Sequence, residues 1–84
     1  MSLKTEVRNA IAEICMEKYQ KRIEPRHVND LEIFRRLNPD FEKKNIVRCP
    51  KKDINACLKE MARAEEVTWG REVNYYYFRN VPKQ

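Results

Sequence analysis

The character of the 84-residue chain changes after Glu65-Glu66, and this change constrains the fold more than any other feature. Before it, apolar residues recur at intervals of three and four, which is typical of amphipathic helices. After it come Val67-Thr68-Trp69 and Val73-Asn74-Tyr75-Tyr76-Tyr77-Phe78, which are rich in residues that favour strands. The sequence therefore predicts an α+β fold in which a β-hairpin, at about residues 67–79, follows a helical part.

The helical part divides into three segments because prolines interrupt it. Pro25 disfavours helix at the residue before it, which predicts a short strand or extended link at residues 22–25. Asn38-Pro39 is a turn-initiating pair and opens a long link with room for one helical turn. Pro50 starts the third segment, since a proline at the first helical position gives up no hydrogen bond. The helices are expected at residues 3–19, 26–37 and 50–64.

Gly70 is the only glycine of the chain, and it lies inside the predicted hairpin. Glycine adopts positive φ without steric cost, which tight turns often require. We therefore expect the turn at Gly70-Arg71-Glu72, with Arg71 at the tip of the hairpin.

The length of the chain predicts one domain, residues 1–84, which buries only about 60–65% of the surface that its unfolded chain exposes. The sequence has a lone His27 and neither a Gly-rich phosphate loop nor a nucleophile motif, so we expect no enzymatic activity and no cofactor. No apolar run reaches the roughly 20 residues of a membrane span, and no signal peptide opens the chain. These features predict a cytoplasmic protein, or a nuclear one in a eukaryote, without a membrane partner.

The three cysteines lack the paired spacing of disulfide frameworks and zinc sites, so we expect neither a disulfide nor a metal. Cys15 and Cys57 fall on the apolar faces of their helices, where a small thiol packs well. Cys49 is expected at the surface. A zinc site built from Cys49, Cys57 and His27 would lack both a close pair and a fourth ligand.

Positive charge is concentrated in the second half of the chain. Residues 1–42 carry eight Lys/Arg and eight Asp/Glu, whereas residues 43–84 carry ten and five, so the whole net charge of +5 lies there. Clustered cations on one element favour a partner that carries phosphate, although a solvated helix face without a ligand is the alternative. The candidate nucleic-acid-binding residues are Arg48, Lys51, Lys52, Asn55, Lys59, Arg63 and Arg71.

The helical period assigns these residues to faces and roles. Ile54, Cys57, Leu58 and Met61 form the apolar face of the third helix, which places Lys52, Lys59 and Arg63 on the opposite side. We expect Arg48, Lys51, Lys52 and Arg71 to neutralise phosphates. The Asn55 amide can pair with adenine edges, and Lys59 or Arg63 can pair with guanine. The alternatives are that Asn55 is a solvated amide and that Lys59 is an ordinary helix-surface cation.

The order helix, extended link, helix, basic helix and hairpin resembles the winged helix-turn-helix superfamily over nearly the full chain. This resemblance implies three helices around one core, with a two-stranded hairpin, the wing, beside the third. It further implies a third helix that enters the major groove of double-stranded DNA and a wing that touches the adjacent backbone. The function implied is that of a small DNA-binding regulator of transcription, often a dimer.

A narrower likeness rests on Pro50-Lys51-Lys52-Asp53-Ile54-Asn55, with Leu58, Met61 and Tyr76-Tyr77. This set is similar to the recognition helix of winged domains that bind Z-form DNA and RNA, which would make Lys51, Lys52 and Asn55 contacts to the zigzag phosphates. The chain departs from those domains at three places. It has Lys59 where they have a tyrosine, Ala56 where they have an arginine, and Asn74-Tyr75 where they have a pair of prolines. We therefore expect no selectivity for the Z-form.

The aromatic hairpin supports an alternative function, a protein interaction or dimerisation module without DNA binding. Trp69, Tyr75, Tyr76 and Tyr77 are too many rings for a two-stranded element to bury entirely, and exposed rings are enriched at protein interfaces. We expect Trp69 and one or two tyrosines to complete the small core, leaving the remaining rings exposed.

Overall fold

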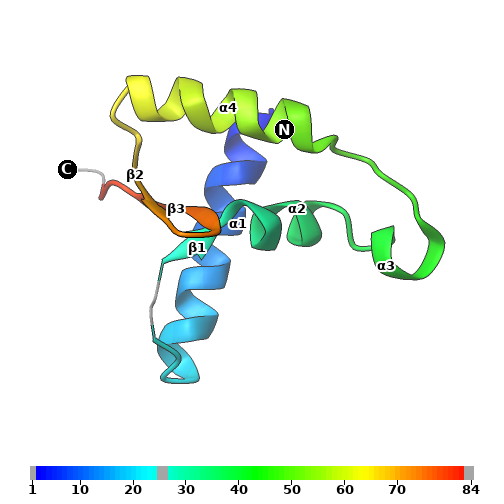
Figure 1. Cartoon of the computed structure of the whole chain (residues 1–84), viewed down its shortest axis with the longest axis horizontal. Coiled ribbons are helices and arrows are strands. Elements are labelled where there is room, and N and C mark those ends of the chain that lie inside the picture. Colours follow the sequence, from blue (N-terminus) through cyan, green and yellow to red (C-terminus); the bar gives the residue numbers. More distant parts are fainter. Residues whose placement is uncertain (1, 25–26, 83–84) are drawn as a thin grey trace.

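A computed structural model of the chain describes residues 2–24 and 27–82. Within them, four helices and a three-stranded antiparallel sheet form the α+β fold that the sequence predicts, an arrangement consistent with a winged helix (Figure 1). The strands lie in the order β1-β3-β2. The elements are α1 (Leu3–Gln20), β1 (Val28–Asn29), α2 (Asp30–Leu37), α3 (Phe41–Lys44), α4 (Lys51–Arg63), β2 (Val67–Glu72) and β3 (Tyr75–Asn80).

The core lies where α1 meets α2, α4 and the sheet (Figure 1). The predicted apolar face of the third helix is confirmed, because Ile54, Leu58 and Met61 of α4 are buried. Phe78 of β3 pairs with Val28 of β1, and both side chains are buried. The other fully or nearly fully buried apolar residues are Val7, Ala10, Ile11, Ile14, Ile33, Phe34 and Val67.

The predicted second helix begins later than expected, at Asp30 rather than at residue 26. A capping box sets this start: the Asn29 side chain accepts from the Glu32 backbone N–H at 2.8 Å, and the Glu32 carboxylate accepts from the Asn29 N–H at 3.2 Å. The expected strand accordingly lies at Val28–Asn29, where it pairs with β3, and not at residues 22–25, of which Pro25 lies outside the described residues. The spacing Asn29-x-x-Glu32 is a sequence signal for this boundary.

Asn38 joins the end of α2 to the segment that leads into α4. Its side chain is 2% exposed and makes four hydrogen bonds to backbone groups. The amide nitrogen donates to the carbonyl oxygens of Phe34 and Cys49, at 2.8 and 2.9 Å. The amide oxygen accepts from the backbone N–H groups of Arg48 and Cys49, each at 2.7 Å. These bonds hold both ends of a segment that extends away from the sheet (Figure 1) and contains α3, the single helical turn that the sequence allowed for.

The three cysteines are in no disulfide. Cys15 and Cys57 pack against the core as predicted, and burial raises the pKa of both thiols, so they stay protonated at neutral pH. Cys49 is half-buried against the core rather than exposed, because Asn38 binds both its N–H and its carbonyl. In the described residues, no three His, Cys, Asp or Glu side chains are grouped so that they could hold a metal ion. Within the same residues, no helix combines the length and apolar character that crossing a membrane requires.

Arg8, on α1, forms hydrogen bonds to both ends of the hairpin. Its guanidinium donates to the carbonyl oxygens of Glu66, just before β2, and Val81, just after β3, at 3.0 and 2.9 Å. The side-chain amide of Asn80, on β3, donates a hydrogen bond to the Arg8 carbonyl oxygen at 2.9 Å. Because both ends of the hairpin are held on the same helical turn, the orientation of β2 and β3 relative to the helices is set.

The hairpin turn lies at Val73–Asn74, not at Gly70. Gly70 is inside β2 without positive φ, and its register partner is Tyr77. A Cβ atom on Gly70 would clash with the hydroxyl end of the Tyr77 side chain, so the tyrosine ring lies across the glycine. The same ring stacks on His27, with ring centroids 4.1 Å apart. Gly70 therefore makes room for a ring, and Arg71 lies within β2 and not at the tip of the hairpin.

We expect Gly70→Ala to destabilise the protein by about 1 kcal/mol. Overpacking costs roughly 1–3 kcal/mol, and the better strand propensity of alanine offsets about 0.5–1 kcal/mol of it. The Tyr77 ring has to leave the glycine, which also breaks its stacking on His27. Urea unfolding measures the stability, and the NMR signals of the His27 ring report the stacking. Val73→Ala, at a 90% exposed turn position, is the control and should change stability by less than about 0.5 kcal/mol. A Gly70→Ala protein more stable than the parent would contradict this account of the contact.

Candidate nucleic-acid interface

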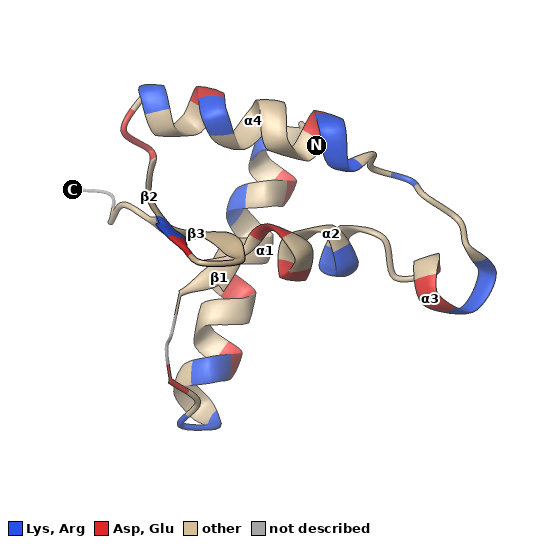
Figure 2. Cartoon of the chain, in the orientation of Figure 1, with Lys and Arg blue, Asp and Glu red and all other residues tan. Residues whose placement is uncertain are grey.

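Three cations on α4 form one exposed row, here called the cationic stripe: Lys52, Lys59 and Arg63. At 100° per residue they lie within about 40° of one another around the helix axis, on the side away from the buried Leu58. Blue segments recur along α4 in Figure 2. Among the described residues, none of the three has an ion-pair partner. The stripe therefore presents uncompensated positive charge to solvent.

The two flanks of the stripe differ in character. The acidic residues of α4, Asp53 and Glu60, lie on one flank, about 60–80° around the helix axis from the nearest residue of the stripe. Asn55 and Ala62 lie on the other flank, which faces the hairpin. An anion that approaches the stripe is therefore repelled from the flank of Asp53 and Glu60 and not from the flank that faces the hairpin.

Two of the sequence-predicted cations are paired within the protein. The Arg48 guanidinium lies 3.0 Å from the Asp40 carboxylate, and the Lys51 ammonium lies 3.7 Å from the Asp30 carboxylate. Arg71, on β2, stacks over the Tyr76 ring with its guanidinium carbon 5.6 Å from the ring centroid. Within residues 2–24 and 27–82, the seven predicted residues thus fall into three groups. The stripe has no ion-pair partner, the Asn55 amide has no hydrogen-bond partner, and three cations already have a contact.

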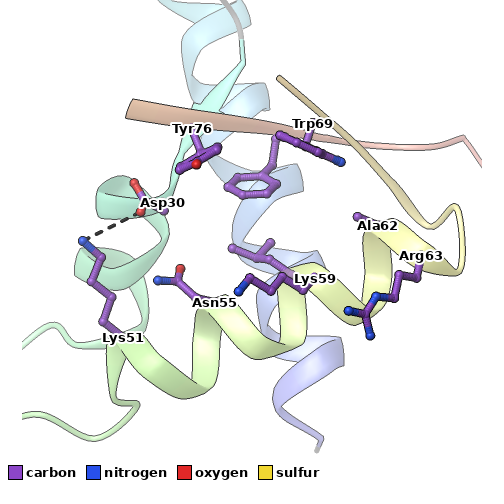
Figure 3. Close-up of a pocket in the computed structure, with 10 residues that line it drawn as sticks. Asp30, Lys51, Asn55, Lys59, Ala62, Arg63, Trp69 and Tyr76 are labelled. Carbon is purple, nitrogen blue, oxygen red and sulfur yellow. Dashed lines mark ion pairs between the residues drawn. The ribbon is translucent and has the colours of Figure 1, made fainter. Parts of the chain in front are cut away.

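A groove of about 580 Å³ separates α4 from the hairpin. Four predicted residues line its α4 side: Lys51, Asn55, Lys59 and Arg63. In Figure 3, Asn55 and Lys59 lie on α4, across the groove from Tyr76 and Trp69. Leu58 and Phe78 contribute the apolar lining between the two sides. The groove therefore brings the cationic helix and the aromatic hairpin into one site.

Two rings of the groove are exposed, Trp69 by 58% and Tyr76 by 43%. The expectation that Trp69 and one or two tyrosines complete the core is wrong, because neither residue type is among the core residues of the described part of the chain. Val67 and Phe78 occupy the core positions on the face of the sheet that carries Trp69. The prediction that some rings stay exposed is confirmed. Tyr75 and Tyr77 are half-buried on the opposite face, beside His27.

Asp30 and the two exposed rings belong to the site although the sequence analysis did not place them there. The excess of aromatic residues in the hairpin was a signal for the rings, but no local pattern links Asp30 to Lys51. The chain matches no protein-family model, no curated protein and no solved structure, so its function has to be argued from the chemistry of this site.

Proposed function

We propose that the protein is a winged helix-turn-helix domain that binds nucleic acid through α4 and the β2–β3 hairpin, and that it regulates transcription. The observation that carries this proposal is the cationic stripe, whose Lys52, Lys59 and Arg63 are exposed and have no ion-pair partner among the described residues. Three such charges on one helix face match the negative charge that recurs along a phosphate backbone.

The arrangement of the elements supports the same proposal. The helix α4 follows α2 and precedes the hairpin, and the strand order is β1-β3-β2. In this assignment α4 is the recognition helix and β2–β3 is the wing. Such a helix enters the major groove, and contacts to the neighbouring phosphates fix its register.

The roles of the individual residues follow from their chemistry. The stripe neutralises phosphates, and Arg71 on the wing adds a further cation. The Asn55 side chain has no hydrogen-bond partner among residues 2–24 and 27–82, so its amide is available to a base edge. Arg48 and Lys51 contribute less, because each already faces a carboxylate.

The second candidate function is a protein docking module, which the exposure of Trp69 and Tyr76 favours. The lining of the groove argues against it as the first choice. Lysine is depleted at protein interfaces, whereas Lys51 and Lys59 both line this groove beside Arg63. Cations interleaved with aromatic rings fit nucleic acid better.

We expect the protein to bind a random-sequence DNA duplex at 50 mM salt and to lose about 100-fold in affinity between 50 and 200 mM. The stripe and Arg71 supply about four phosphate contacts, which corresponds to a slope of about −3 to −4 for log affinity against log salt. Fluorescence anisotropy with a labelled duplex measures both quantities. An absence of binding at 50 mM salt, both to this duplex and to a single strand of the same length, would overturn the proposed function and leave the docking module as the better account.

A further inference from the structure

The groove between α4 and the hairpin has the size and lining of a site for a flat ring. Its volume of about 580 Å³ falls in the range of roughly 300–1,000 Å³ that ligand pockets occupy. Leu58 and Phe78, both buried, contribute to its apolar lining. Asn55 adds a hydrogen-bonding amide on the α4 side (Figure 3). Asp30 is the one acidic residue among the described residues that line the groove, and its carboxylate is compensated by Lys51 at 3.7 Å. An anionic ligand is therefore not repelled from the groove.

Trp69 offers the stacking surface. The Trp69 and Tyr76 rings are tilted by 53° with centroids 6.0 Å apart, so the two rings are not stacked face to face. Arg71 covers the Tyr76 ring, whereas the Trp69 side chain remains 58% exposed. Nucleobases stack on such rings without regard to sequence, because every base has a π-face.

The groove is continuous with the cationic stripe. Lys59 and Arg63 belong to both, whereas Lys52 belongs to the stripe alone. If the phosphates of a strand lie along the stripe, its bases therefore lie next to the opening of the groove. A base in an intact duplex is held in its stack and cannot enter, whereas an unpaired base can.

We propose that this groove binds an unpaired nucleobase stacked on Trp69, and that the protein prefers single-stranded nucleic acid to an intact duplex. The inference rests on the proposed function, because the stripe has to hold the phosphates beside the groove. It adds the class of nucleic acid and names the hairpin ring that recognises it.

Three labelled probes of about 15 nucleotides test the proposal: a thymidine strand, a strand of the same length with abasic sugars, and a random duplex. The first two carry the same phosphates but differ in the rings. We expect the thymidine strand to bind about 5- to 100-fold more tightly than the abasic strand, because stacking of one base on an aromatic ring contributes an affinity gain of about this size. Trp69 is the only tryptophan, so its fluorescence reports the groove directly. It should be quenched by the thymidine strand and not by the other two probes.

Trp69→Ala should lower the affinity for the thymidine strand to that for the abasic strand. Tyr19→Ala removes a 61% exposed ring of α1 outside this groove and should change neither affinity. Circular dichroism confirms that both variants are folded.

The outcomes separate this inference from the proposed function. If the thymidine and abasic strands bind equally and the Trp69 fluorescence stays constant, the groove binds no base, while the cationic stripe still binds nucleic acid. If none of the three probes binds at 50 mM salt, the proposed function fails, and the inference fails with it.

Discussion

Asn38→Ala should destabilise the protein by about 3–5 kcal/mol. The substitution removes four hydrogen bonds from a side chain that is 2% exposed and leaves both backbone polar groups of Cys49 without that partner. Each buried group that loses its bond costs about 1–3 kcal/mol. An 84-residue protein has about 4–12 kcal/mol of total stability, so the loss is a large share of it.

Urea unfolding of the Asn38→Ala protein and its parent tests this expectation. Asn55→Ala is the matched control, because Asn55 carries the same side chain without a hydrogen-bond partner in the described part of the chain. It should change stability by no more than about 0.5 kcal/mol. If the two variants are equally stable, the buried amide of Asn38 does not organise the link between α2 and α4.

Replacing all three stripe residues, Lys52, Lys59 and Arg63, with alanine should weaken duplex binding by about 100- to 1,000-fold at 50 mM salt. A slope of about −0.9 per phosphate makes each contact worth roughly tenfold at that salt concentration, and three contacts are lost. The salt slope should become shallower by about three. Stability should change by no more than about 1 kcal/mol, because all three side chains are exposed and alanine favours helix.

A control variant with the same net charge separates a local effect from a general one. Lys21, Lys43 and Lys44 are exposed and lie outside α4, so replacing them with alanine also lowers the formal charge from +5 to +2. Anisotropy should show only a small loss for this variant. Equal losses in the two variants would mean that the overall charge of the protein, and not the stripe, attracts the nucleic acid.

Helix positions were predictable where one face of a helix is buried. The apolar spacing of α1 predicted residues 3–19 and the structure has Leu3–Gln20, because burial on one side imposes the helical period on the sequence itself. The start of α2 was missed although its signal is local. The Asn29 and Glu32 side chains stop the helix from extending backward, and apolar spacing does not detect a cap.

The hairpin shows what residue type can and cannot predict. Aromatic and β-branched residues correctly indicated two strands after Glu66. The turn was misplaced because Gly70 was expected to supply a positive φ. Its missing side chain instead makes room for Tyr77 on the other strand. Such a contact depends on strand register, which is set only when the two strands pair.

The sequence by itself determined the α+β class, the apolar face of α4 and the cationic stripe, because each depends on residue type and on spacing within one element. Only the tertiary structure decided that Asn38 is a buried hydrogen-bonding centre, that Arg48 and Lys51 face carboxylates, and that Trp69 and Tyr76 stand across a groove from α4. These features join elements that are distant along the chain. Their partners are chosen by packing of the whole core, which local patterns do not encode.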